Sequence, residues 1–199
     1  MERYFRTGLF EDAIDSLREA QSQIALIRAK RTAIKWATIA MHSAVQGHMA
    51  LVLNQGNGLN VLAKKDAEAW LKAHYEHKPY PTNLRMDGFM NLYAKIKQME
   101  FMGNFVGAEP FRSLGHDVSM KRLNKIRNRF IHFNVDGWSI EISGLHVVFR
   151  EAVEVIEYSA NSINFPWHRS DDFETRRTMC DHLIEQIKDL CRSPFELSK

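Results

Sequence analysis

Apolar residues in this 199-residue chain recur at steps of three and four residues over long stretches. This spacing is typical of one buried face of an α-helix. The long stretches cover residues 9–28, 33–53, 84–102, 119–134, 144–163 and 172–192, and a shorter one covers 66–76. Period-two alternation is confined to 138–142, where a short strand or hairpin arm fits. The sequence therefore predicts an all-α, up-and-down bundle of four core helices with additional helices packed on them.

The stretch 33–53 carries a stripe of small residues. Its members are Ala33, Ala37, Ala40, Ala44 and Gly47. Small side chains on one face let a neighbouring helix approach closely, so we expect a tight partner helix here. We place a turn at 29–32, because one unbroken helix from 9 to 53 would be unusually long for a globular domain.

Length and composition fit one domain over residues 1–199. No run of apolar residues is long enough to span a membrane, and the N-terminus lacks the apolar segment of a secretory signal. Cys180 and Cys191 lie about 16 Å apart if one helix holds both, so they cannot pair there. We therefore expect a reduced, cytoplasmic protein without a membrane partner.

The basic residues gather in one part of the chain, although the net charge is only +3. Between Arg112 and His132 there are six Lys or Arg residues and a single acid, Asp117. Ser119 is a candidate N-cap for the helix predicted there. One face of that helix is apolar, and the opposite stripe holds Lys121, Lys125, Asn128 and His132, with Arg127 at the edge of the apolar face. A local surface of this kind suits phosphate groups.

The run Arg127-Asn-Arg-Phe-Ile-His132 resembles the signature of the HEPN (higher eukaryotes and prokaryotes nucleotide-binding) superfamily. That signature is an Arg, four to six residues and a His, with a polar residue, often Asn, after the Arg. The resemblance covers about residues 9–163, with the C-terminal helix at 172–192 as an addition. It implies a metal-independent endoribonuclease without a cofactor, active as a homodimer, with an antitoxin or nucleotidyltransferase as a further partner in a toxin or defence setting. The Tyr that some members carry two positions after the His is Asn134 here.

The chemistry of RNA cleavage assigns roles to these side chains. His132 is the candidate general acid or base, because an unperturbed imidazole titrates near neutrality. Arg127 is the candidate phosphate clamp, and Asn128 can orient the imidazole or bind phosphate. Lys121, Lys125 and Arg129 are the candidate RNA contacts. The reaction needs an acid and a base, and the second His132 of a symmetric dimer would supply the other imidazole.

Other interpretations stay open. Arg127 could pair with an acid and His132 could lie in the core, which would leave a non-catalytic HEPN-like module that binds nucleotide or RNA. A second Arg/His pair, Arg177 and His182, lacks the polar neighbour. His74 and His77 favour a solvated face over a metal site. Among the remaining aromatic and imidazole side chains, His42 and His48 suit packing or the surface, Trp36, Trp70 and Trp167 suit core or cap positions, and Trp138 suits either packing or base stacking.

Overall fold

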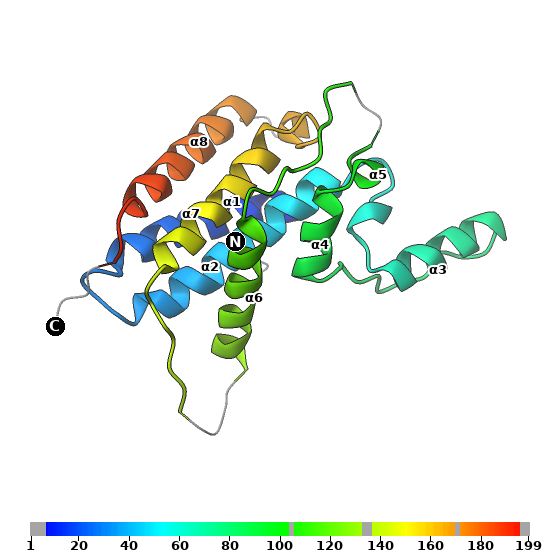
Figure 1. Cartoon of the computed structure of the whole chain (residues 1–199). Helices are drawn as coiled ribbons and strands as arrows, with labels where there is room; N and C mark the ends of the chain where they lie inside the picture. The colour runs from blue at the N-terminus through cyan, green and yellow to red at the C-terminus, as the bar shows by residue number, and fades with distance from the viewer. Residues whose placement is uncertain (1–6, 104–105, 133–136, 170–171, 196–199) are drawn as a thin grey trace, which may run out of the picture.

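The structure is a computed structural model that describes residues 7–103, 106–132, 137–169 and 172–195. Within these ranges the chain forms eight α-helices, two single-turn 3-10 helices and no strand (Figure 1). The predicted all-α bundle is therefore confirmed. No helix among the described residues is long and apolar enough to cross a lipid bilayer.

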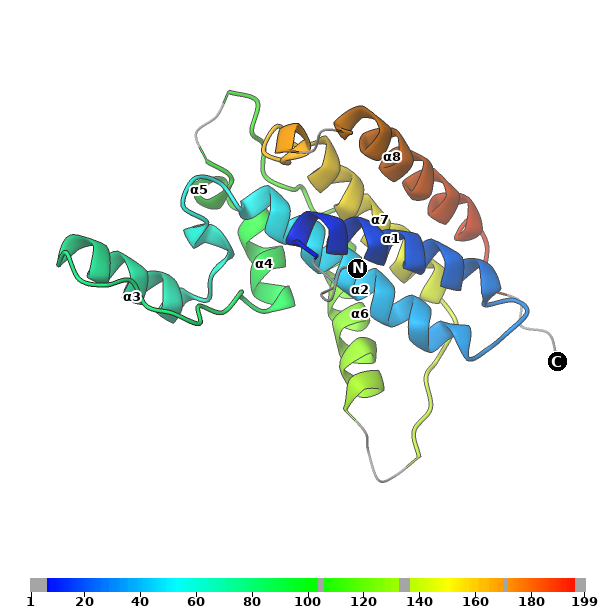
Figure 2. The same ribbon diagram turned by 180° about the vertical axis from the view of Figure 1, so that it is seen from behind.

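Four helices form the centre of the bundle: α1 (Leu9–Leu26), α2 (Ala33–Leu53), α7 (Leu145–Asn161) and α8 (Phe173–Leu190). Helix α2 lies between α1 and α7, and α8 covers the other side of α1 and α7 (Figure 2). The small-residue stripe of α2 faces α1, where Gly47 meets Ala13 so closely that an added Cβ would lie 2.7 Å from the Ala13 Cβ. The predicted tight partner of the 33–53 helix is thus α1.

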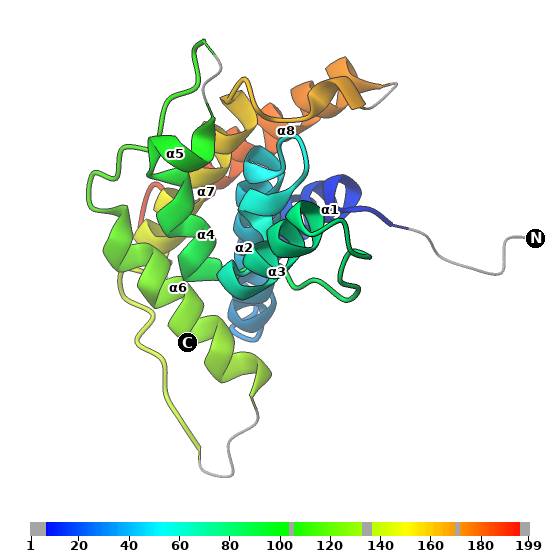
Figure 3. The same cartoon turned by 90° about the vertical axis from the view of Figure 1, so that its right-hand side faces the viewer.

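Helix α6 (His116–Ile131) crosses this bundle and packs against α2 and α7. It buries Met120, Leu123 and Ile126, which follow one another at steps of three residues on one face of the helix. Its C-terminal end extends beyond the other helices (Figures 1 and 3). The last turns of α6 are therefore accessible from more than one side, and His132 follows at the C-cap.

The start of α6 differs from the prediction, because the helix begins at His116 and Ser119 is buried in its second turn. The N-cap is Gly115, whose φ of 105° is a left-handed conformation that favours glycine. Asp117 follows in the first turn, where the helix dipole favours a carboxylate. Ser119 fails as a cap because Gly115 already turns the chain into the helix five residues before Met120, where the buried apolar face starts.

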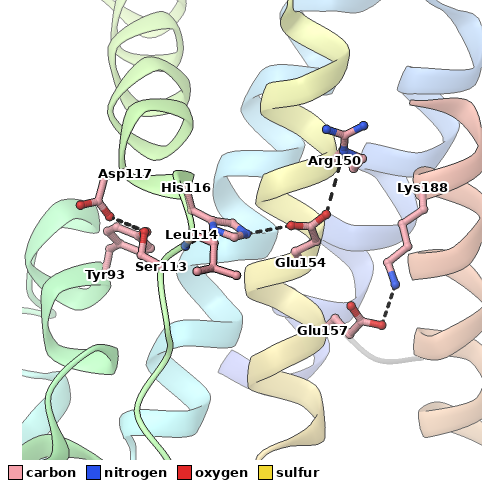
Figure 4. Close-up of polar contacts among 9 residues, drawn as sticks. All are labelled: Tyr93, Ser113, Leu114, His116, Asp117, Arg150, Glu154, Glu157 and Lys188. Carbon is pink, nitrogen blue, oxygen red and sulfur yellow. Dashed lines mark hydrogen bonds and ion pairs between the residues drawn. The ribbon is translucent and has the colours of Figure 1, made fainter. Parts of the chain in front are cut away.

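Polar contacts fix this N-terminal end to two neighbouring helices (Figure 4). Asp117 accepts hydrogen bonds from Ser113 at 2.8 Å and from Tyr93 of α4 (Phe89–Ile96) at 2.9 Å, and His116 Nε2 donates to Glu154 of α7 at 2.7 Å. The Leu114 backbone N–H donates to His116 Nδ1 at 3.1 Å. These contacts hold one end of α6 while its other end projects.

The predicted helix over 84–102 is divided in the structure into α4 (Phe89–Ile96) and α5 (Met99–Met102). Residues before Phe89 are extended, because Ala63 N–H donates to the Arg85 carbonyl and Asp87 N–H donates to the Val61 carbonyl. Pairing with the short 3-10 segment Leu59–Val61 thus replaces the first helical turn.

Helix α3 (Lys64–Tyr75) extends away from the bundle (Figures 1 and 2). The predicted cap, Asp66, lies inside the helix and instead accepts hydrogen bonds from the backbone and side chain of Arg85. Trp70 stacks on Tyr80 with ring centroids 4.7 Å apart. This arm is stabilised by aromatic stacking more than by the main core.

Two further expectations change in the structure. The segment predicted as a strand at 138–142 is irregular, and Arg122 of α6 donates to the carbonyls of Glu141 and Ser143 in place of a neighbouring strand. Trp36, expected in a core or cap position, is 53% exposed. Both cysteines are free, as the spacing predicts, and both are buried.

Candidate active site

The exposed face of α6 forms one side of a pocket of about 480 Å³. It is lined by Met90 of α4 and, from α6 and its C-cap, by Lys121, Asn124, Lys125, Asn128, Arg129 and His132. We call this the basic pocket. Helical spacing produces it, because these side chains recur every three or four residues and share one face. The structure therefore brings together the predicted candidates His132, Asn128, Lys121, Lys125 and Arg129.

His132 is exposed and occupies the C-cap of α6. Its backbone N–H donates to the Asn128 carbonyl at 3.0 Å, so the helical hydrogen bonding continues to this residue. An exposed imidazole at the end of a projecting helix can reach a ligand from solvent. The interpretation that His132 is a core residue is wrong. Residues 133–136, which include the Asn134 named above, lie outside the described residues.

Arg127 lies in a second pocket, of about 380 Å³, which we call the amide pocket. Helices α2, α4 and α6 form it, and Gly88 completes it; its lining residues are His42, Gln46, Gly88, Phe89, Met90, Asn91, Asn124, Arg127 and Asn128. Met90, Asn124 and Asn128 also line the basic pocket, so the two pockets adjoin. Arg127 is half-buried, and burial lowers the pKa of its guanidinium.

Hydrogen bonds to the oxygen atoms orient the side-chain amides of Asn124 and Asn128, which line both pockets. Arg127 Nη1 donates to Asn128 Oδ1 at 3.0 Å, and His42 Nε2 lies 3.0 Å from Asn124 Oδ1. Since each amide oxygen is engaged within the protein, each Nδ2 is left as a donor. Together with the neighbouring lysines and arginines, these groups present donors and positive charge. This arrangement suits an acceptor-rich anion such as a phosphodiester.

His42 is a member of this site that the sequence did not identify. It is 1% exposed in α2, and its ring stacks on Phe89 with centroids 4.1 Å apart. Burial lowers the pKa of His42 to about 4; the hydrogen bond to Asn124 opposes this, and the charge of Arg127 adds to it. The ring is therefore neutral near pH 7. Because the proton on Nε2 is directed at Asn124 Oδ1, Nδ1 is an acceptor.

Two buried side-chain nitrogen atoms have no hydrogen-bond partner within the described ranges, and both belong to residues of the amide pocket. They are His42 Nδ1, an acceptor, and Arg127 Nε, a donor. Buried polar atoms are nearly always paired in folded proteins, so two unpaired atoms of opposite character at one site are unusual.

A further pocket, of about 370 Å³, lies on the other side of the basic stripe. Lys121, Lys125 and Arg129 line it together with Trp138, which is 37% exposed. The Trp138 ring packs edge-on against Phe130, and the Arg129 guanidinium carbon lies 5.8 Å from the Trp138 ring centre. Both uses expected for Trp138, packing and an exposed aromatic face, are thus compatible with its position.

The other polar clusters offer less for catalysis. Both ring nitrogens of His116 are engaged, by Glu154 and by the Leu114 backbone, while the Ser113 hydroxyl donates to Asp117 (Figure 4). No serine is therefore activated by this histidine. His74 Nδ1 lies 2.9 Å from the Tyr80 hydroxyl. In the part of the chain that the structure describes, no three His, Cys, Asp or Glu side chains are grouped to hold a metal ion.

The sequence contained a signal for one of the two missed residues. Asn124 lies on the stripe between Lys121 and Asn128, one turn from each, and helical spacing alone could have added it. His42 lies 82 residues before Asn124, in a helix of small and apolar residues, and only the packing of α2 against α6 brings it to the site. In comparisons with family models, with curated proteins and with solved structures, nothing matches this chain.

Proposed function

We propose that this protein is a metal-independent endoribonuclease of HEPN type. The observation that carries the proposal is the convergence of His132, Asn128 and three cations on the basic pocket, directly beside the amide pocket that contains Arg127. The donors and positive charges match a phosphodiester, and the exposed imidazole is a group that can accept or donate a proton.

In the proposed reaction, a ribose 2′-OH attacks the adjacent phosphorus and the bond from phosphorus to the 5′-oxygen breaks. One imidazole removes the 2′-OH proton and another protonates the leaving 5′-oxygen, which leaves a 2′,3′-cyclic phosphate and a 5′-hydroxyl. Arg127 and the two amides oppose the charge that develops on the phosphate oxygens. His132 performs one proton transfer, and we propose that the partner's His132 performs the other.

Exposed apolar residues support a dimer built on α6. Leu114 and Val118 are 87% and 74% exposed, and Val118 lies on the same stripe as Lys121 and Lys125. Large apolar side chains left in solvent at one end of a functional face favour contact with a second copy. The toxin or defence setting, with an antitoxin or nucleotidyltransferase as further partner, follows from the HEPN resemblance alone.

The test is RNA cleavage by purified protein in EDTA. We expect wild type to cut single-stranded or looped RNA, and both Arg127→Ala and His132→Ala to lose cleavage. Mixing wild type with an equal amount of His132→Ala tests the shared site. If both chains supply an imidazole and subunits exchange at random, about a quarter of the all-wild-type activity remains, against about half if each chain acts alone.

The second candidate is a non-catalytic module that binds RNA or nucleotide. One observation favours it: Arg127 lines the amide pocket but not the basic pocket, whereas His132 lines the basic pocket but not the amide pocket. RNA binding by wild type without any cleavage, in EDTA or with added divalent cations, would support this candidate and refute the nuclease.

A further inference from the structure

The amide pocket holds an unpaired acceptor and an unpaired donor. His42 Nδ1 can only accept a hydrogen bond in the neutral ring, and Arg127 Nε–H can only donate one. Leaving both unpaired in the interior is costly, because each has lost its hydration without gaining a partner. A single group that donates to one atom and accepts from the other would satisfy both. A hydroxyl group, of a ligand or of a water molecule, can do both, whereas a phosphate oxygen, a carbonyl and an ammonium ion each provide only half of what is needed.

The position of the amide pocket indicates which hydroxyl it takes. It shares Met90, Asn124 and Asn128 with the basic pocket, whose cations suit the phosphates of a nucleic acid. In RNA, each phosphate is attached to a ribose whose 2′-OH is a donor and an acceptor, and this group is what distinguishes RNA from DNA.

We propose that His42 and Arg127 form a 2′-hydroxyl subsite, in which the ribose hydroxyl donates to His42 Nδ1 and accepts from Arg127 Nε–H. The subsite selects RNA over DNA by holding the 2′-OH of a nucleotide next to the cleaved linkage, so the attacking 2′-OH stays free for the His132 imidazole. His42 is thus a specificity-determining residue, and no second chain is needed for this contact. The proposal rests on RNA being the ligand of the proposed function.

The packing of His42 supports this role. The ring is held on one side by Phe89 and at Nε2 by Asn124, so its orientation is fixed and Nδ1 is directed away from the Asn124 contact. Neither unpaired atom is exposed to solvent, so a ligand must displace a lining side chain to reach them. Met90, an unbranched and half-buried side chain at the junction of the two pockets, can move without a change in the backbone.

His48 provides a matched control on the same helix. It is also buried and stacks on a phenylalanine, Phe165, with ring centroids 5.5 Å apart. Its Nδ1 is paired with the Ala44 carbonyl at 2.8 Å, and it lines neither pocket. A His→Phe substitution at position 48 therefore removes a stacked, buried imidazole without touching the proposed subsite.

The experiment measures the binding of labelled oligonucleotides of one sequence to full-length protein in the His132→Ala background, which prevents cleavage. The ligands are RNA, DNA and an oligonucleotide with 2′-fluoro groups, which cannot donate a hydrogen bond. We expect RNA to bind about tenfold more tightly than either analogue. Adding His42→Phe should reduce this preference to about onefold with DNA affinity unchanged, and adding His48→Phe should preserve it.

Equal binding of RNA, DNA and the 2′-fluoro analogue would overturn the subsite, and so would a preference that survives His42→Phe. The 2′-fluoro comparison needs no substitution at position 42, so equal binding there overturns the subsite even if His42→Phe does not fold. Cleavage of RNA by wild type together with equal binding of all three ligands refutes the subsite alone. RNA-selective binding without cleavage refutes the nuclease and leaves the subsite intact.

Discussion

Exchanging two residues at the α1–α2 contact tests the packing that places α2 in the bundle. In Gly47→Ala the new Cβ would lie 2.7 Å from the Ala13 Cβ, where ordinary contacts are 3.4–4 Å, so the helices must separate. Overpacking of this kind costs about 1–3 kcal/mol, offset by about 1 kcal/mol because alanine favours helix over glycine. Gly47→Ala should therefore destabilise the protein by about 0–2 kcal/mol.

The reverse change, Ala13→Gly, removes a buried methyl group and introduces a glycine into a helix. Each effect costs about 1 kcal/mol, so we expect a loss of about 2 kcal/mol. In the double variant the helix propensities cancel, and the methyl group from position 47 occupies the space left at position 13. The remaining 3.1 Å approach to the Ala13 Cα limits the recovery. The double variant should lie within about 1 kcal/mol of wild type, with a favourable coupling of about 1–3 kcal/mol.

Urea denaturation followed by circular dichroism measures these differences in the free energy of unfolding. They appear as shifts of the urea midpoint, with the dependence of that free energy on urea concentration unchanged. Gly88→Ala is the control, because an added Cβ there meets no atom within 4 Å. Additive single changes would mean that the two residues do not touch, and the close approach of α1 to α2 would then be wrong.

Three other perturbations have defined outcomes. Hydrogen bonds from Ser113, then Lys97 and Tyr93, lower the pKa of Asp117 to about 2. The Asp117 carboxylate therefore stabilises the folded protein fully above its unfolded pKa near 4, and this stabilisation is lost as the pH falls through about 2. In acid denaturation, the stabilities of wild type and Asp117→Asn should differ most at neutral pH and converge between pH 4 and pH 2. For binding of single-stranded RNA, Lys121→Ala and Lys125→Ala should each reduce the slope of log K against log salt concentration by about 0.7. An unchanged slope would show that the substituted lysine does not contact the RNA. Lys95→Met should lower the free energy of unfolding in urea by about 3 kcal/mol, because it leaves the buried Asp87 carboxylate without the Lys95 ammonium 2.8 Å away. A decrease below about 1 kcal/mol would refute that ion pair.

Local periodicity was sufficient for most of the fold. The helices over 9–26, 33–53, 145–161 and 173–190 match their predicted stretches closely, because each buries one continuous apolar face. The errors arose where a more distant segment competes for the backbone. Residues 85–87 pair with 61–63, which no pattern within 84–102 reveals. At the start of α6, the left-handed Gly115 was a stronger boundary signal than Ser119.

In the candidate site, too, residues of one helix could be predicted from spacing, whereas residues brought together by packing could not. Lys121, Lys125, Asn128 and His132 share a stripe because they share a helix, so their grouping followed from spacing alone. His42 and Met90 come from other helices, and the amide pocket exists only through the packing of α2, α4 and α6. The same packing leaves Arg127 half-buried, with its guanidinium paired with Asn128.

The proposed function requires that the His132 imidazole on α6 takes part in cutting RNA. The most direct measurement compares cleavage of a labelled RNA in EDTA by wild type, His132→Ala and His182→Ala, where His182 is the exposed histidine of the other Arg/His pair. We expect 2′,3′-cyclic phosphate ends from wild type and His182→Ala, and no product from His132→Ala. Equal cleavage by wild type and His132→Ala, or none by wild type, would contradict the claim.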